Sequence, residues 1–276
     1  MSHRGTILIT GGAGSVASKI RPHLRENGFS LRLLDRASPA DTAGDEVVLG
    51  DLSDVAGLGE AMRGCQAVLH LAGCTVDGPW EDQVTGNVTN CLAVFEAARA
   101  AGVHRVIYAS SNHAVGMYPR SRKLDDRINL RPDSRYGVTK AFGELAASYF
   151  ADKYGMQVLC VRIGSCETQP LDRRRLSNWI SPRDLAQLVA IGASHPLLTF
   201  AVVYGVSDNA RCFYDNGTAE KLGYRPVDRA EDYAADILAR DPYPQAGATI
   251  SVAEFTQGGI YVESEFEGEM ERLRQM

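Results

Sequence analysis

Tyr136 and Lys140 stand four positions apart in the stretch Tyr-Gly-Val-Thr-Lys. On a helix, this spacing places both side chains on one face. A tyrosine alone titrates near pH ~10, but a neighbouring ammonium favours its phenolate form. The pair therefore predicts a general base that removes a hydroxyl proton. A surface tyrosine–lysine pair is the alternative interpretation.

A glycine-rich turn follows an apolar run near the start of the chain. Gly11 allows a tight turn, Gly14 lets a pyrophosphate approach the backbone, and Ala17 lets a helix pack on a strand. Backbone amides at the start of that helix, around Ser15 and Val16, are expected to face the phosphates. The pattern predicts a dinucleotide site because it lies between a strand and a helix.

Asp35 ends a second apolar run about 20 residues after the glycines, where an acid contacts the adenosine ribose. A carboxylate there repels the 2′-phosphate of NADP, although Arg36 beside it attracts one. We therefore expect NAD as the cofactor. The other expected contacts with the cofactor are Asp51, Leu52, Leu71, Ala72, Gly73, Asn87, Tyr136 and Lys140.

Polar residues gather where a strand near residue 110 ends. Ser111 stands 25 residues before Tyr136, and a strand-loop-helix course between them would let both bond one substrate oxygen. Asn112 and His113 follow directly and are candidates for substrate contacts. Alternatively, Asn112 makes a turn and His113 is a loop histidine with internal partners.

Composition excludes several classes of function. The chain has 276 residues, a net charge of −5 and no Lys/Arg block, which makes nucleic acid an improbable partner. No apolar run reaches membrane-spanning length, and residues 1–4 lead directly into the first strand without a signal peptide. Six scattered cysteines without a CxxC pair are expected to be reduced packing residues, with no metal site. We expect a cytoplasmic protein.

Strand and helix patterns alternate along the first part of the chain. This rhythm predicts an α/β fold with a doubly wound parallel sheet of the Rossmann type. We expect a single domain over residues 1–276, in which 1–162 mainly bind NAD and 163–276 contribute a small C-terminal substrate-binding lobe. Strands are expected at 6–10, 31–35, 46–49, 66–71, 104–110, 157–162 and 199–204, and helices at 14–27, 54–63, 82–101, 135–154, 216–222 and 229–239.

These motifs together resemble the extended short-chain dehydrogenase/reductase family, and the resemblance covers nearly the whole chain. Within it, SSNHAVG at 110–116, RPDSRYGVTKAFGE at 131–144 and VRIGSC at 161–166 are similar to uronate dehydrogenases. The resemblance implies NAD-dependent oxidation of a hexuronic acid, such as D-glucuronate or D-galacturonate, at C1 to an aldarolactone. It implies catalytic roles for Ser111, Tyr136 and Lys140.

The resemblance assigns binding of the substrate carboxylate to Arg174. A guanidinium can hold a carboxylate through two parallel hydrogen bonds, which supports this role. The alternative is that the three consecutive arginines at 173–175 form a solvated charge run. The other expected substrate contacts are Thr75, Ser111, Asn112, His113 and Ser165.

Two other functions fit the same nucleotide-binding pattern. One is an epimerase or dehydratase acting on a nucleotide-linked sugar, although such enzymes usually have a larger C-terminal lobe. The other is a regulator that senses NAD without catalysis, although such proteins often lack the tyrosine or the lysine. Related enzymes often pair through the helices corresponding to 82–101 and 135–154, which implies a homo-oligomer.

Overall fold

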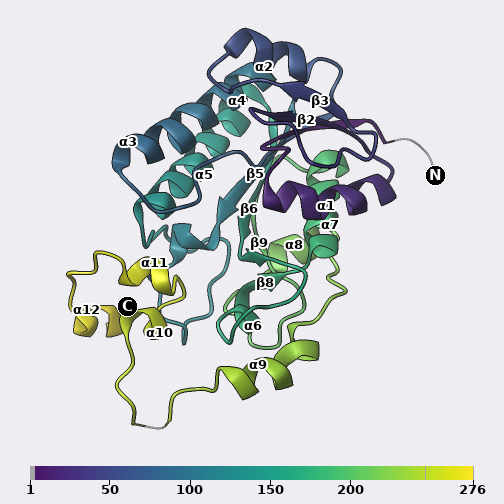
Figure 1. Ribbon diagram of the computed structural model, residues 1–276. Coiled ribbons are helices and arrows are strands. Elements are labelled where there is room, and N and C mark those ends of the chain that lie inside the picture. The colour runs from purple at the N-terminus through teal and green to yellow at the C-terminus, as the bar shows by residue number, and fades with distance from the viewer. Residues whose placement is uncertain (1–3, 246, 276) are drawn as a thin grey trace.

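A parallel seven-stranded sheet forms the centre of the molecule in the order β3-β2-β1-β4-β5-β6-β9 (Figure 1). The computed structural model describes residues 4–245 and 247–275. The expectation that residues 1–4 lead directly into the first strand falls largely on residues 1–3, which lie outside the described residues. The strand order confirms the predicted doubly wound sheet. The strands are β1 Thr6–Thr10, β2 Ser30–Asp35, β3 Glu46–Leu49, β4 Ala67–His70, β5 Arg105–Ser111, β6 Gln157–Ile163 and β9 Phe200–Gly205.

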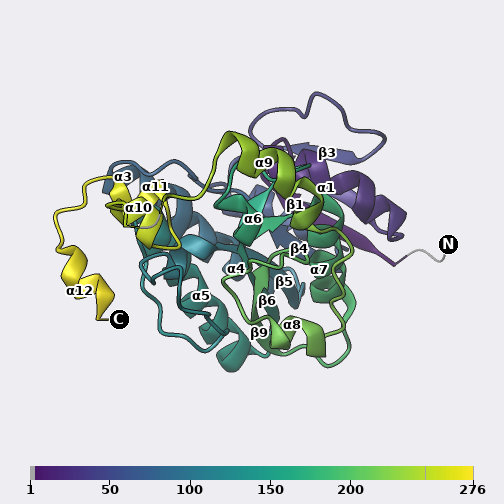
Figure 2. The same cartoon turned by 90° about the horizontal axis from the view of Figure 1, so that it is seen from below.

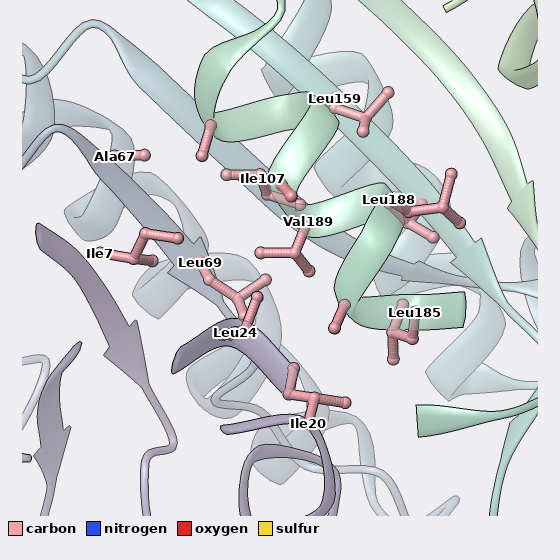
Figure 3. Close-up of a cluster of buried hydrophobic side chains, with 14 of the residues drawn as sticks. Ile7, Ile20, Leu24, Ala67, Leu69, Ile107, Leu159, Leu185, Leu188 and Val189 are labelled. Atoms are coloured by element: carbon pink, nitrogen blue, oxygen red, sulfur yellow. The ribbon is translucent and has the colours of Figure 1, made fainter. Parts of the chain in front are cut away.

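One face of the sheet is covered by α1 (Ser15–Glu26) and α7 (Pro182–Ser194). Alternate strand residues point to this face because successive side chains of a strand project to opposite sides. Ile7, Leu69 and Ile107 from the sheet meet side chains from both helices in one buried cluster (Figure 3). The helix side chains in this cluster include Ile20, Leu24, Leu185, Leu188 and Val189.

The other face is covered by α2 (Val55–Met62), α4 (Asn90–Ala100) and α5 (Arg135–Tyr154). Leu8 and Tyr108 project to this side and pack against helix residues such as Phe95 and Phe150. The Phe95 and Phe150 rings stack with centroids 5.0 Å apart. Both faces of the sheet are therefore buried, which explains the nearly uninterrupted apolar runs of its strands.

Two features differ from the sequence-based expectation. The helix expected at 82–101 is divided into α3 (Trp80–Gln83), a π-helical segment η1 (Val84–Thr89) and α4. The strand expected at 199–204 is β9, which pairs with β6 and extends the main sheet. β9 extends the sheet and α7 covers one of its faces. The central layers of the fold therefore include residues beyond 162.

The remaining elements gather at one end of the sheet, where Figures 1 and 2 show the C-terminal segment beside the loop that follows β5. Helices appear near both positions expected for this lobe, 216–222 and 229–239. Three further short helices lie in the tail, where few sequence signals precede its charged end. The elements are η2 (Asn112–Val115), β7 (Ser165–Cys166), α6 (Arg175–Asn178), β8 (Trp179–Ile180), α8 (Gly217–Lys221), η3 (Ala230–Tyr233), α9 (Ala234–Arg240), α10 (Val252–Phe255), α11 (Ile260–Glu263) and α12 (Met270–Arg274).

No helix within residues 4–245 and 247–275 has both the length and the apolar composition needed to cross a bilayer.

Candidate active site

The turn between β1 and α1 has a backbone shape suited to a dinucleotide. Gly11 has a φ of 71°, and a Cβ at this position would lie 2.8 Å from the backbone nitrogen of Ala72. Gly14 precedes α1 without a side-chain hydrogen bond capping the helix. The first amides of α1, at Ser15 and Val16, therefore have no side-chain acceptor at the cap and suit a phosphate.

Asp35 lies at the end of β2 beside this turn. Its carboxylate accepts hydrogen bonds from the backbone nitrogens of Ala13, at 3.0 Å, and Ala37, at 3.2 Å. These bonds hold the negative charge at the position where the ribose of a dinucleotide is expected. Arg36 is exposed next to it.

The next two expected cofactor contacts differ in exposure. Asp51 is exposed, and its carboxylate accepts bonds from the Ser53 backbone nitrogen at 2.9 Å and hydroxyl at 2.8 Å. These bonds, led by the one from the backbone, lower the pKa of Asp51. Leu52 is buried in the core beneath α2.

The loop after β4 runs from the expected cofactor residues toward Lys140. Asn87, in the π-helical segment, accepts from the Cys74 backbone nitrogen at 2.9 Å and donates to Thr139 Oγ1 at 3.0 Å. A Cβ on Gly73 would lie 2.5 Å from Asn87 Oδ1 and 3.6 Å from Lys140 Nζ. Asn87 thus lies beside the expected cofactor residues, but its amide is engaged with the protein. Leu71 and Ala72, just before Gly73, are partly exposed.

Ser111, Tyr136 and Lys140 come together where β5 meets the start of α5. Ser134 caps this helix by accepting a bond from the Gly137 backbone nitrogen at 3.0 Å. Lys140 Nζ lies 5.7 Å from the centre of the Tyr136 ring and donates to the Ala109 carbonyl at 2.9 Å. All three predicted catalytic side chains are buried. The helical spacing of Tyr136 and Lys140, together with the position of Ser111 at the end of β5, therefore gathers the three side chains as expected.

Burial dominates the ionisation of this pair. Removal from water raises the pKa of Tyr136 above its ordinary value, although the Ser111 hydroxyl opposes the shift. Burial also lowers the pKa of Lys140 to about 8. That Lys140 lowers the pKa of Tyr136 stays a prediction, because burial, the largest influence on the phenol in this structure, acts in the opposite direction.

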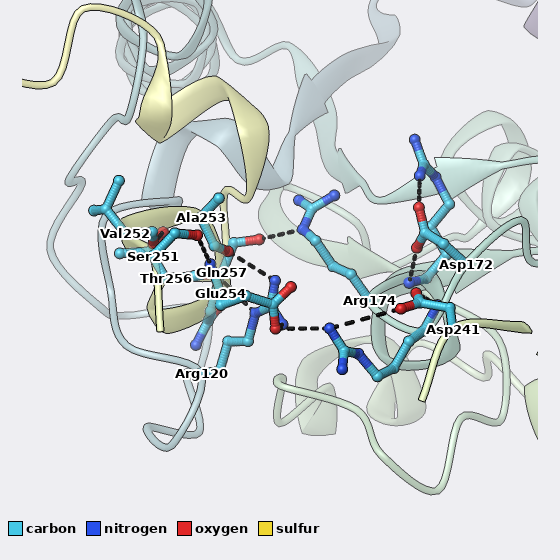
Figure 4. Close-up of polar contacts among 12 residues, drawn as sticks. Arg120, Asp172, Arg174, Asp241, Ser251, Val252, Ala253, Glu254, Thr256 and Gln257 are labelled. Atoms are coloured by element: carbon cyan, nitrogen blue, oxygen red, sulfur yellow. Dashed lines mark hydrogen bonds and ion pairs between the residues drawn. The ribbon is translucent and has the colours of Figure 1, made fainter. Parts of the chain in front are cut away.

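The three consecutive arginines have different surroundings. Arg173 pairs with Glu254 at 2.8 Å (Figure 4). Arg175 pairs with Asp172 and donates to Ser165 Oγ at 3.1 Å. Within the described parts of the chain, no carboxylate forms an ion pair with Arg174. The interpretation of all three as a solvated charge run therefore does not hold.

Arg174 is held by uncharged groups. Its Nε donates to the Gln257 carbonyl at 2.9 Å (Figure 4). With the Asn112 amide turned so that Oδ1 faces the guanidinium, that oxygen accepts from Arg174 Nη2 at 3.2 Å, and Nδ2 donates to the Ile163 carbonyl at 3.2 Å. Burial lowers the pKa of Arg174, but a guanidinium still carries its charge near neutral pH.

Of the other expected substrate residues, Asn112 contacts this guanidinium, whereas Ser165 and Thr75 form their bonds with other residues. Asn112 and His113 directly follow Ser111 and form the first turn of η2. Ser165 lies in β7, where its hydroxyl accepts the bond from Arg175. Thr75 is exposed, and its carbonyl accepts a bond from the Tyr261 hydroxyl at 2.7 Å.

Three residues beside this cluster were not expected from the sequence: Asp133, Gln257 and Tyr261. The Tyr261 ring stacks on His113 with centroids 4.0 Å apart, and its centroid lies 6.0 Å from that of Tyr136. Asp133 had a usable signal, since it stands three residues before Tyr136 within the motif at 131–144. The two tail residues had none, because their partners lie more than 80 residues away in the sequence.

No group of three or more His, Cys, Asp or Glu side chains in the described residues could hold a metal ion.

Residues 7–192 match the NAD dependent epimerase/dehydratase family. The chain belongs to this family. Among its relatives is a uronate dehydrogenase of Pseudomonas syringae pv. tomato, 40% identical over 94% of this chain and 93% of the relative.

Solved structures within the family agree with this placement. The crystal structure of uronate dehydrogenase from Agrobacterium tumefaciens is 37% identical, with a TM-score of 0.86, and the match covers 94% of this chain and 97% of the other. A mutant of that enzyme complexed with NAD has a TM-score of 0.87 at 36% identity, covering 96% of this chain and 99% of the other. The chain thus aligns with these uronate dehydrogenases over nearly their full lengths.

Proposed function

We propose that this protein oxidises C1 of a free hexuronic acid with NAD and forms the aldarolactone. The observation that carries the proposal is Arg174, a partly buried cation that contacts Asn112, the residue after Ser111, and that forms no ion pair with a carboxylate among the described residues. A substrate carboxylate would supply the missing negative charge. The full-length similarity to uronate dehydrogenases supports the same substrate class.

The glycine turn, Asp35 and the uncapped start of α1 fit NAD. Gly11 and Gly14 would hold the pyrophosphate, and Asp35 the adenosine ribose. When bound, NAD accepts the hydride from C1, and its positively charged nicotinamide favours the phenolate form of a nearby tyrosine.

Tyr136 is the residue that would remove the proton from the C1 hydroxyl. Ser111 would bond the same oxygen, since its hydroxyl already interacts with the phenol. Lys140 is fixed by the Ala109 carbonyl and would hold the nicotinamide ribose. Because the phenol is buried, Tyr136 would lose its own proton only as positive charge accumulates around it.

The remaining polar residues would orient the sugar ring. Asn112 lies between Arg174 and the end of β6, so it suits a contact with the carboxylate end. His113, Thr75 and Ser165 would bond ring hydroxyls or the carboxylate. Oxidation of a cyclic hemiacetal at C1 gives a lactone, which water can open, so the reaction needs no hydrolytic residues.

NADH absorbance tests this function directly. Purified protein with NAD should accumulate NADH steadily with D-glucuronate or D-galacturonate, and much more slowly with neutral aldoses. An epimerase acting on nucleotide sugars would return its hydride and leave no lasting NADH. A protein that binds NAD and turns over none of the free sugar acids would instead fit a regulator.

We propose that the two parts of the chain on either side of residue 162 bind different ligands. The earlier part of the chain would bind NAD, and the later part would supply Arg174, Gln257 and Tyr261 to the substrate side, while α7 and β9 complete the sheet. Substitutions in the later part should then change the KM for the sugar acid far more than the KM for NAD. Equal changes in both would contradict this division.

A second copy of the chain is the partner we propose for α4 and α5. Val138, Leu145 and Tyr149 lie along one side of α5, and Leu92 of α4 and Tyr154 are also exposed. Apolar groups gathered in this way are typical of interaction surfaces. Leu145→Glu should reduce the mass measured by light scattering, and an unchanged mass would contradict this interface.

The cytoplasm is the compartment we propose. All six cysteines are free thiols, including the partly exposed Cys74 and Cys212. Reduced thiols persist in the cytoplasm. Cell fractionation should recover the protein there.

A further inference from the structure

Asp133 is a buried carboxylate beside the active site to which neither the sequence motifs nor the proposed reaction assigns a role. Its Oδ2 lies 2.7 Å from Nδ1 of His113, and its side chain is fully shielded from solvent. Its Oδ1 accepts a bond from the Ser134 hydroxyl at 2.8 Å. A buried carboxylate needs hydrogen-bond donors, and these two groups are the ones that the described residues provide.

Three glycines from separate segments leave the space that this carboxylate occupies. A Cβ on Gly116 would lie 1.7 Å from Asp133 Oδ2, and one on Gly258 would lie 1.9 Å from the same atom. A Cβ on Gly137 would lie 3.1 Å from Oδ1. The end of η2, the first turn of α5 and the C-terminal segment therefore meet around Asp133, and larger residues would push the carboxylate away from His113.

The His113 ring is also fixed by its aromatic neighbours. Tyr261 stacks on it at an interplanar angle of 29°, and Tyr136 meets it edge-on at 65° with centroids 5.8 Å apart. The Tyr261 hydroxyl is anchored on the Thr75 carbonyl. Among the described residues, no hydrogen bond reaches Nε2 of His113, the second nitrogen of the ring.

We propose that Asp133 is a positioning residue that keeps the proton of His113 on Nδ1. An ionised carboxylate only accepts hydrogen bonds, so Nδ1 must be the donor in this contact. In neutral His113, Nε2 then has a free lone pair and accepts a hydrogen bond from a ring hydroxyl of the substrate. This inference rests on the proposed oxidation of a hexuronic acid and makes His113 the hydrogen-bond acceptor in its contact with the substrate, which selects for a hydroxyl donor.

Asp133→Asn tests the role of the carboxylate. If the amide oxygen keeps the bond from Ser134, the amide nitrogen faces His113 and donates to Nδ1. The proton of His113 then moves to Nε2, which becomes a donor. We expect the KM for the uronate to rise about tenfold, as for one lost hydrogen bond, with kcat and the Kd of NAD changed less than twofold.

Asp152→Asn is the matched control, since Asp152 is an exposed carboxylate of α5, and it should leave the KM unchanged. An Asp133→Asn protein with normal melting behaviour and an unchanged KM would overturn the proposal. The NADH assay of the wild-type protein reports separately on the proposed function. Failure of that assay is thereby distinguishable from failure of the role of Asp133.

Nitrogen NMR of the wild-type protein tests the proton position even if the variant does not fold. Long-range ¹H–¹⁵N correlation spectra of ¹⁵N-histidine-labelled protein distinguish the two neutral tautomers. The His113 signals are those that disappear in His113→Asn. We expect His113 to carry its proton on Nδ1, and a proton on Nε2 would overturn the proposal.

Discussion

At the scale of single residues, the proposed proton transfer depends on Tyr136. Tyr136→Phe removes the hydroxyl and keeps the ring that packs near His113 and Tyr261. We expect kcat to fall by about 10³-fold or more, because the acid–base group is lost, while the Kd of NAD changes little. Stopped-flow NADH formation and NAD titration measure these two quantities. Turnover near the wild-type rate would remove Tyr136 from the proposed role.

Arg174 and Arg175 allow a matched test of carboxylate binding. Each substitution by alanine removes one positive charge, but Arg175 already has a carboxylate partner in Asp172. Arg174→Ala should raise the KM for uronates by about 100-fold, since a charge-assisted bidentate contact is lost. The KM for a slowly oxidised neutral sugar should change little. Equal effects of Arg174→Ala and Arg175→Ala on the uronate KM would support a general charge effect instead.

The charged side chain of Lys140 should lower the free energy of unfolding because it is buried. Its pKa falls from 10.5 to about 8 in the folded protein, so the charged amine disfavours folding by about 3 kcal/mol. The cost is fully present below pH 8 and fades between about pH 8 and 10.5, where the unfolded chain still binds the proton.

Lys140→Met should therefore unfold at a higher urea concentration than the wild-type protein at pH 7. Loss of the bond to the Ala109 carbonyl offsets about 1 kcal/mol of the gain. The difference in free energy of unfolding should shrink when the same measurement is made near pH 10. A difference that does not depend on pH would contradict the assigned burial effect.

At the scale of elements, a buried ion pair ties α5 to the sheet. Arg162 of β6 donates to both oxygens of Glu144, at 2.9 and 2.8 Å, and the Ser110 hydroxyl of β5 donates to the same carboxylate at 2.5 Å. Glu144 lies one helical turn beyond Lys140. This network therefore fixes the helix that carries Tyr136 relative to the strand that carries Ser111.

Arg162→Met should destabilise the protein by about 3–5 kcal/mol, because it leaves the Glu144 carboxylate buried without its partner. Adding Glu144→Leu should recover part of this loss, since no unpaired charge then remains. Urea unfolding measures both variants. A double variant less stable than Arg162→Met would contradict the assignment of the loss to an unpaired buried carboxylate.

Element positions were largely predictable because the buried strands and their intervening helices have strong periodic patterns. The π-helical segment was not, since the residues of Val84–Thr89 carry no local pattern that distinguishes a widened turn, which accompanies the bonds of Asn87 to distant residues. The strand β9 was recognised, but residues 163–276 were assigned to the C-terminal lobe, whereas β9 lies in the main sheet, because its pairing with β6 is a long-range contact.

At the scale of the whole molecule, the motifs predicted the glycine turn after β1 and the proximity of Ser111, Tyr136 and Lys140, because these residues lie close together in sequence or follow strand ends. The motifs did not predict that the C-terminal segment brings Gln257 and Tyr261 to the candidate site. Arg120 fastens that segment by donating to the carbonyls of Ala253, at 2.7 Å, and Thr256, at 3.0 Å (Figure 4). Contacts between residues more than 130 positions apart in the sequence leave no local sequence signal.

The central claim joins two ends of the site: the carboxylate of a sugar acid at Arg174 and its C1 hydroxyl at Tyr136. A crystal structure of the Tyr136→Phe variant with NAD and D-glucuronate tests both ends in one measurement. The account predicts the carboxylate on the Arg174 guanidinium and the C1 hydroxyl beside Ser111, facing the substituted ring. A carboxylate bound by other residues, or a C1 atom turned away from that ring, would contradict it.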